Sequence, residues 1–176
     1  MKFTRIPFEG VYVIEIEPVF DERGFFARTW QQEEFLAHGL GSDFTQCSIS
    51  SNARRGTLRG LHYQDEPYQE AKLVRCSAGA IWDVVIDLRQ ESPTHAKWFA
   101  IELTKANRRM LYAPEGFAHG FQTLADETEV FYQITQSYQP QSARGVRWND
   151  PFFHIEWPIK DPILSPRDKS FPDYAL

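Results

Sequence analysis

The sequence predicts an all-β protein, built as a sandwich or barrel of antiparallel strands, on three observations. Phe, Tyr and Trp make up 15% of the chain, and large flat side chains favour the pleated surface of strands. Segments in which apolar and polar residues alternate recur along the chain. Turn residues separate these segments roughly every 8–12 positions, a spacing typical of antiparallel sandwiches. The length of 176 residues favours one domain with a sizeable core, so we expect residues 1–176 to form a single domain.

The expected elements follow in chain order. A strand at 11–16 leads to a turn at 21–24 and then to an extended aromatic segment. Residues 31–38 form the best helix candidate, because they lack proline, Thr29 could cap their N-terminus and Gly39 follows their end. The tail from 149 to 172 contains five prolines and should wrap the body as ordered coil with short helical turns. Further strands are expected at 57–64, 72–77, 81–88, 98–103, 109–112, 121–124 and 130–138.

Charge and cysteine content exclude several classes of protein. The chain has 24 acidic and 19 basic residues, a net charge of −5, so neither a nucleic acid nor an anionic membrane is an expected partner. Cys47 and Cys76 are too few for a disulfide framework and are typical of a reducing compartment. The sequence contains no apolar run of membrane-spanning length and does not begin with a signal peptide. We therefore expect a cytoplasmic protein.

Two segments carry polar side chains suited to chemistry. In residues 57–64 (TLRGLHYQ), Gly60 separates Arg59 from His62, as happens where a backbone approaches another group closely. A guanidinium can hold phosphate and a neutral imidazole can take a proton near pH 7. Alone, this segment is equally compatible with a strand that has two surface polar residues. Residues 114–121 (PEGFAHGF) add His119, and in a jelly roll both segments would lie on adjacent inner strands.

The second segment resembles the second motif of the cupin superfamily, Pro-x-Gly-x-x-His. The first resembles the first cupin motif with one large departure, since His62-Tyr63-Gln64 stands where metal-binding cupins have His-x-His. An amide oxygen is a poor transition-metal ligand beside imidazole. We therefore expect no metal and no other cofactor, with two histidines and Glu70 as the alternative zinc set.

Several motifs in the same order resemble the dTDP-4-dehydrorhamnose 3,5-epimerase family over nearly the whole chain. They are DERGFF at 21–26, RGLHYQ, KLVRC, GAIWDVVIDLR, SPT, PEGFAHGF, WNDP and LSPRD at 164–168. The resemblance implies a homodimeric, metal-independent enzyme with a cupin-type double-stranded β-helix, here with one short N-terminal helix and a Pro-rich tail. Such enzymes epimerise one or both carbons beside the ketone of a nucleotide-linked 4-keto-6-deoxy sugar, in deoxysugar or surface-polysaccharide biosynthesis.

The chemistry of that reaction needs a base on one face of the sugar, an acid on the other and a group that stabilises the enolate. His62 is the natural base, and Lys72 is a cation that could face the developing oxyanion. By resemblance, Asp168 is the carboxylate partner of His62 and Tyr132 is the proton donor. Taken singly, Tyr132 could be plain core, Asp168 a turn cap and Lys72 a solvated surface residue.

Substrate binding needs local positive charge in an acidic protein. Tyr138, Gln46 and Ser48 fall at or near positions that contact sugar or base in the family, and the segment 23–28 implies a contact with the nucleotide of the neighbouring subunit. Asp83 could be an inward carboxylate that supports the site, although a satisfied interior residue is slightly favoured. The cations available for the diphosphate are Arg59, Lys72, His119, Arg23 and Arg167.

Three departures from the family pattern lie in recognition positions. Arg28 and Ala143 each stand where the family has Glu, and Gln46-Cys47-Ser48 replaces Gln-x-Asn. A cation in place of an acceptor should change which base or hydroxyl is accepted, so the sequence predicts the reaction type more firmly than the nucleotide or the choice of C3, C5 or both. The alternatives are a sugar 3,4-ketoisomerase, a non-catalytic nucleotide-sugar-binding cupin and a metal-dependent oxygenase.

Overall fold

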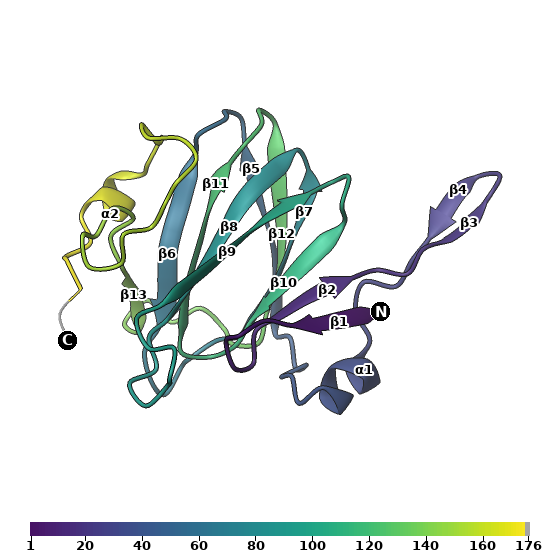
Figure 1. The fold of residues 1–176 in the computed structure, drawn as a ribbon, viewed down its shortest axis with the longest axis horizontal. Helices are drawn as coiled ribbons and strands as arrows, with labels where there is room; N and C mark the ends of the chain where they lie inside the picture. Colours follow the sequence, from purple (N-terminus) through teal and green to yellow (C-terminus); the bar gives the residue numbers. More distant parts are fainter. Residues whose placement is uncertain (175–176) are drawn as a thin grey trace.

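The computed structural model describes residues 1–174 and consists mainly of two facing antiparallel sheets (Figure 1). The larger sheet has the strand order β1 (Lys2–Arg5), β2 (Tyr12–Glu15), β10 (Arg109–Ala113), β7 (Lys72–Ala78), β12 (Thr128–Ile134) and β5 (Gln46–Asn52). The smaller sheet has the order β13 (Ala143–Gly145), β6 (Leu58–Gln64), β11 (Phe117–Thr123), β8 (Ala80–Asp87) and β9 (Trp98–Thr104). This arrangement confirms the predicted all-β jelly roll, as two open sheets rather than a closed barrel.

The main core fills the space between the two sheets. Apolar side chains that alternate along each strand meet there, and most of them are fully buried. Burial of this kind is the main stabilising contribution in such a sandwich. The members of this core include Val13, Val74, Leu111 and Val130 from the larger sheet and Ile81, Val85, Leu103 and Phe121 from the smaller one.

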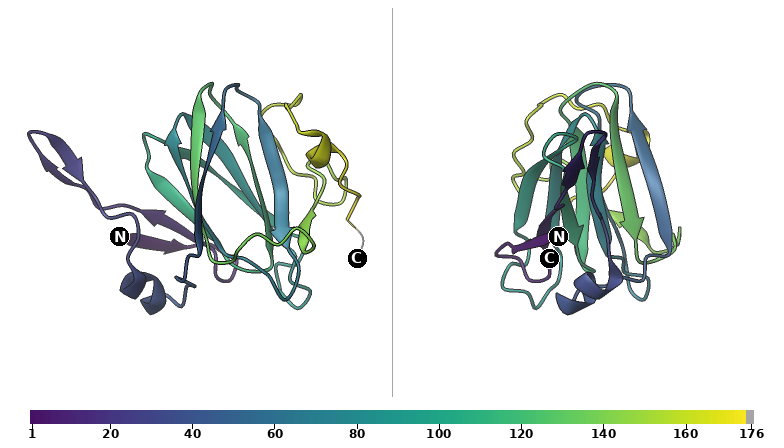
Figure 2. Two further views of the ribbon diagram at one scale, coloured as in Figure 1. Left: turned by 180° about the vertical axis from the view of Figure 1, so that it is seen from behind. Right: turned by 90° about the vertical axis from the view of Figure 1, so that its right-hand side faces the viewer.

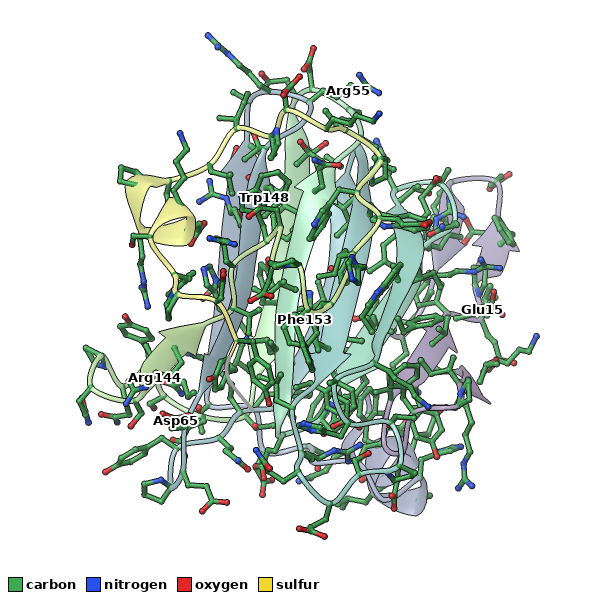
Figure 3. All side chains as sticks on the ribbon, turned by 60° about the vertical axis from the view of Figure 1, so that its left-hand side comes forward. Glu15, Arg55, Asp65, Arg144, Trp148 and Phe153 are labelled. Atoms are coloured by element: carbon green, nitrogen blue, oxygen red, sulfur yellow. The ribbon has the colours of Figure 1, made fainter. Side chains whose placement is uncertain are left out.

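The C-terminal tail covers the outer face of the smaller sheet, as Figure 3 shows around Phe153. The stripe of Trp82, Val84 and Ile86 on β8 packs against this tail. The alternation predicted for β8 is therefore confirmed, and it places Asp83 on the opposite, inward face, where it is fully buried. The predicted ordered coil with short helical turns is also found, with α2 spanning Pro166–Lys169.

A two-stranded hairpin and a short helix complete the N-terminal part. The hairpin of β3 (Val19–Asp21) and β4 (Gly24–Phe26) projects away from the sheets, as Figure 1 and the left view of Figure 2 show. We call residues 19–26 the arm. The helix α1 spans Gln32–Ala37 and buries Phe35. The prediction that Thr29 caps this helix was wrong: Gln31 is the N-cap residue, and its side chain makes no capping hydrogen bond.

Some predicted strand boundaries were wrong. The strand predicted at 121–124 begins at Phe117, because all seven residues of β11 are buried and the PEGFAHGF segment itself enters the sheet after its turn. The strand predicted to reach residue 138 ends at Ile134, so Tyr138 lies in the following loop. Strands β1, β5 and β13 were not individually predicted, and each lies at an edge of its sheet. Within residues 1–174 no helix has the length and apolarity needed to cross a membrane.

Candidate active site

A cavity of about 460 Å³ is lined by residues of both sheets. It lies at the side where β5 forms the edge of the larger sheet and β6 and β13 form the edge of the smaller sheet. Both sheets contribute side chains to it, and α2 adds Arg167 from the tail. Ten residues proposed from the sequence line this one cavity: Gln46, Ser48, Arg59, His62, Glu70, Lys72, His119, Tyr132, Tyr138 and Arg167. The structure thus brings together residues that lie up to 121 positions apart in the chain.

Two glycines allow the strands that carry the histidines to lie close together. A Cβ atom on Gly60 would lie 2.5 Å from the Cα of Gly120, and φ at Gly60 is +136°. A Cβ on Gly120 would in turn lie 2.8 Å from the carbonyl oxygen of Arg59. The close backbone approach predicted at Gly60 is therefore confirmed. It accompanies a register in which His62 on β6 is paired with His119 on β11.

His62 forms a hydrogen-bonded pair with Asp168. Its Nε2 atom lies 2.7 Å from Oδ1 of Asp168, which the first turn of α2 presents to β6. Burial alone would raise the pKa of Asp168, but hydrogen bonds with His62, with Ser165 and with the Gly60 backbone together hold it below its ordinary value. An ionised carboxylate only accepts hydrogen bonds, so Nε2 of His62 is the donor, and in the neutral imidazole the lone pair is then on Nδ1.

Tyr132 lies on β12, in the sheet that faces His62. It borders the same cavity and contacts the ring of His119 edge-on, at 5.9 Å between centroids. Burial raises the pKa of the Tyr132 phenol well above its ordinary value; the charge of Asp83 adds to this rise and that of Arg59 opposes it. The phenol is therefore protonated at neutral pH and can act as an acid.

Asp83 is the inward carboxylate for which the sequence left two interpretations, a group that supports the site or a satisfied interior residue. Its Oδ1 atom accepts a hydrogen bond from Nε2 of His119 at 2.8 Å, and both side chains are buried. Its Oδ2 atom has no hydrogen-bond partner among the described residues. Asp83 is therefore a buried interior residue that holds a histidine of the cavity wall, which fits both interpretations, and its role in supporting the site stays a prediction.

Lys72, Glu70 and Gln64 form a connected group at the cavity wall. Nζ of Lys72 lies 2.8 Å from Oε1 of Glu70 and donates to the carbonyl oxygen of His62 at 3.0 Å. Lys72 is buried, so it is not the solvated surface lysine of the alternative interpretation. Glu70 also accepts from the Gln64 amide at 2.9 Å. Among residues 1–174, no three His, Cys, Asp or Glu side chains are grouped closely enough to hold a metal ion.

The cations of the cavity are held in place by neutral partners as well as by acids. Arg59 donates from Nε to Asn52 at 2.7 Å, and Arg167 donates to the Tyr138 hydroxyl at 3.4 Å. Sequence reasoning missed Arg144, which lines the cavity because its strand, β13, pairs with β6. The guanidinium of Arg144 forms an ion pair with Asp65 at 2.7 Å (Figure 3). No motif marks Arg144, so only the strand pairing could have identified it.

Two of the predicted binding residues lie outside this cavity in the same chain. Arg23, at the tip of the arm, is highly exposed and forms an ion pair with Asp21. Arg28, which follows the arm, donates to the side chain of Gln31 at 2.9 Å. Of the other departures from the family pattern, Ser48 and Ala143 do line the cavity.

Comparisons with known proteins give the same family as the motifs. The family model described as dTDP-4-dehydrorhamnose 3,5-epimerase matches residues 5–175. The chain is 45% identical over 166 residues to a dTDP-4-dehydrorhamnose 3,5-epimerase from Shigella flexneri, covering 94% of this chain and 90% of the relative.

Solved structures of such enzymes superpose closely on this one. The enzyme from Elizabethkingia anophelis gives a TM-score of 0.96 at 37% identity, with 99% of this chain and 96% of that chain covered. The enzyme from Bacillus anthracis, solved with TDP and PPi bound, gives 0.95 at 38% identity, with 98% and 99% covered. The chain therefore belongs to the dTDP-4-dehydrorhamnose 3,5-epimerase family of cupin-fold isomerases, which act in deoxysugar biosynthesis.

Proposed function

We propose that this protein inverts both C3 and C5 of a dTDP-linked 4-keto-6-deoxyhexose, with His62 as base and Tyr132 as acid. The observation that carries the proposal is that these two residues line one cavity from facing sheets, His62 on β6 and Tyr132 on β12. Inversion at a carbon beside a ketone requires proton removal on one face and proton return on the other. Two groups on opposite walls of one cavity meet this requirement.

Nδ1 of His62 removes the proton. Nε2 is committed to the ionised Asp168, which holds the ring in one tautomer and stabilises the imidazolium that forms. The electron pair of the broken C–H bond moves into the enolate, and the phenol of Tyr132 supplies a proton to the opposite face of the carbon. The keto group at C4 lies between C3 and C5, so removal of a proton from either carbon gives an enolate of the same ketone. The same two residues can therefore act at both positions.

Lys72 stabilises the negative charge that develops on the keto oxygen. Its ammonium group borders the cavity and is held by Glu70 and by the His62 carbonyl, so it does not need to reorganise during the reaction. The diphosphate is then bound by Arg59 and Arg167, which supply positive charge in a protein of net charge −5, and by His119, whose ring borders the same cavity. Tyr138, Gln46 and Ser48 complete the contacts to the nucleoside and the sugar.

The protein acts as a homodimer in which the arm reaches the partner's nucleotide. Val19, Phe20 and Phe26 on the arm are 72%, 67% and 76% exposed, and large apolar side chains gathered on a projecting hairpin are typical of an interface. The outer face of the larger sheet adds Ile49, which is also well exposed, beside its strand partner Phe131. Arg23 and Arg28 would then contact the neighbouring cavity, since neither lines the cavity of its own chain.

The test is incubation with dTDP-4-keto-6-deoxyglucose in deuterated water, followed by NMR of the product. The proposal expects solvent deuterium at C3 and C5 together with inversion at both. Inversion at one carbon only would refute the double epimerisation, and movement of the ketone to C3 would favour the ketoisomerase. Absence of exchange with any 4-keto sugar nucleotide would remove the epimerase assignment for this site.

A further inference from the structure

Gln64 stands where metal-binding cupins have their second histidine, and its amide contacts four groups of the protein, with the two hydrogens of Nε2 shared among three acceptors. Its Nε2 atom reaches the carbonyl oxygens of Tyr68 at 3.0 Å and Ser137 at 3.3 Å and the carboxylate of Glu70 at 2.9 Å. Its Oε1 atom accepts from the backbone N–H of Gln139 at 2.6 Å. The side chain is buried. Both ends of this amide are therefore used within the protein.

Two of these contacts flank Tyr138. The residue before it, Ser137, is held through its carbonyl, and the residue after it, Gln139, is held through its N–H. The other hydrogen bonds of the Ser137 and Gln139 backbones are local, to Gln136, Ser142 and Ala143. Gln64 thus fastens this stretch of loop to β6, and the bond from the Ala143 N–H to the Gln139 carbonyl links it to the neighbouring edge strand β13.

The same amide is joined to the catalytic wall. Glu70 accepts from Gln64 with one oxygen and from Lys72 with the other, and Lys72 donates to the carbonyl of His62. A continuous chain of hydrogen bonds therefore links the loop at the rim to the strand that carries the base. Groups joined in this way are expected to couple energetically.

We propose that Gln64 is a positioning residue for substrate binding, which holds the loop around Tyr138 so that the phenol is preorganised at the cavity rim. This inference rests on the proposed function, in which Tyr138 contacts the nucleoside. A loop held before binding loses less conformational entropy on binding, so the clamp should increase affinity for the nucleotide rather than the rate of the chemical step.

The test compares Gln64→Met with the matched control Gln122→Met. Gln122 is also a buried glutamine that clamps one loop with two hydrogen bonds, to the carbonyl and N–H of Ile159, and it does not line the cavity. Met keeps the length of the side chain and removes its hydrogen bonds in both variants. Both variants should be destabilised to a similar extent, which controls for a purely structural effect.

Hydrogen exchange measured on the Gln139 amide reads the clamp directly and requires no ligand. We expect exchange about tenfold faster in Gln64→Met and unchanged in Gln122→Met. Unchanged protection of Gln139 in the Gln64 variant would overturn the inference. Should Gln64→Met not fold, Gln64→Asn keeps an amide but shortens the side chain by one methylene, so that it no longer reaches the Gln139 N–H, and faster exchange of the Gln139 amide is again the expected result.

Calorimetric titration with dTDP then tests the link to binding. Gln64→Met should weaken dTDP binding about tenfold. In a protein that already carries Tyr138→Ala, the same change should weaken binding little further, because both substitutions act through the same contact. Full additivity of the two changes, or unchanged affinity in Gln64→Met, would overturn the positioning role. Failure of the wild type to bind dTDP would instead count against the proposed substrate, and the exchange experiment alone would decide whether Gln64 holds the loop.

Discussion

Nε2 of His62 lies 2.7 Å from Oδ1 of Asp168, although 106 residues separate the two in the chain. The pair depends on the Pro-rich tail, which crosses the outer face of the smaller sheet and ends in the short helix that presents Asp168. A tail with little regular structure therefore completes the His62–Asp168 pair.

Replacing Asp168 by Asn should reduce turnover about a thousandfold, by analogy with carboxylates that orient a catalytic histidine. The amide keeps the size of the side chain but no longer stabilises an imidazolium, and it can donate to His62 and so favour the wrong tautomer. The measurement is the rate of deuterium incorporation at C3 and C5. Incorporation at the wild-type rate would contradict the assigned pair.

Replacing Tyr132 by Phe should permit exchange at the carbon that His62 deprotonates but prevent inversion there. The base is intact in this variant, while the proton donor on the opposite face is lost. His62→Ala is the complementary change and should abolish exchange at every position. Comparison of isotope incorporation with product stereochemistry separates the two effects, and inversion by the His62 variant would refute the choice of base.

The pH dependence of turnover should show no loss of activity from ionisation of Tyr132 below its ordinary pKa. Burial raises the pKa of this phenol well above that value, so the proton-donating form persists as the pH rises. The measurement is the profile of kcat from neutral to alkaline pH in the wild type. A descending limb near neutral pH in the wild type that is absent from the pH profile of isotope exchange in Tyr132→Phe would contradict the raised pKa.

Asp87→Asn should destabilise the protein at neutral pH but not in strong acid. Burial alone would raise the pKa of Asp87, but hydrogen bonds from Arg89, Ser92 and Thr94 lower it from 3.8 to about 2. Because the pKa is lower in the folded protein than in the unfolded chain, ionised Asp87 stabilises the fold by about 2 kcal/mol at any pH well above 3.8. This contribution is lost as the pH falls from 3.8 through about 2. Denaturant unfolding of both proteins across this window should show the difference shrinking; a constant difference would contradict it.

Gly60→Ala should destabilise the fold by about 3 kcal/mol or more, since the added Cβ would meet the backbone of Gly120 at a positive φ. Gly39→Ala is the control, because φ there is also positive but nothing lies within 4 Å of the added Cβ. The control should cost only about 1 kcal/mol. Denaturant unfolding of the two variants measures the difference, and equal costs would show that the close approach of β6 and β11 contributes nothing.

Replacing Phe20 and Phe26 together by Ser should convert the proposed homodimer to monomer, because these are the two most exposed rings of the arm. Light scattering after size-exclusion chromatography measures the mass. Leu36→Ser changes another exposed apolar residue, on α1, and should leave the mass unchanged. A double variant of wild-type mass would show that the arm does not carry the interface.

The sequence by itself determined the all-β class, the outward stripe of β8, the close approach at Gly60 and the family. These follow from short-range patterns, since alternation, turn residues and a glycine between two polar residues act within a few positions. The family motifs likewise predicted His62, Tyr132 and Asp168 as site residues without any coordinates.

Only the tertiary structure decided which partners those residues have. The bond between Asp83 and His119, the position of Arg144 in the cavity and the four contacts of Gln64 depend on strand pairings and on loops that meet across the two sheets. A local pattern cannot report such contacts, because each side chain is compatible with several surroundings until the sheets and the tail are packed together. The same packing leaves the arm, with Arg23 at its tip, outside the cavity of its own chain.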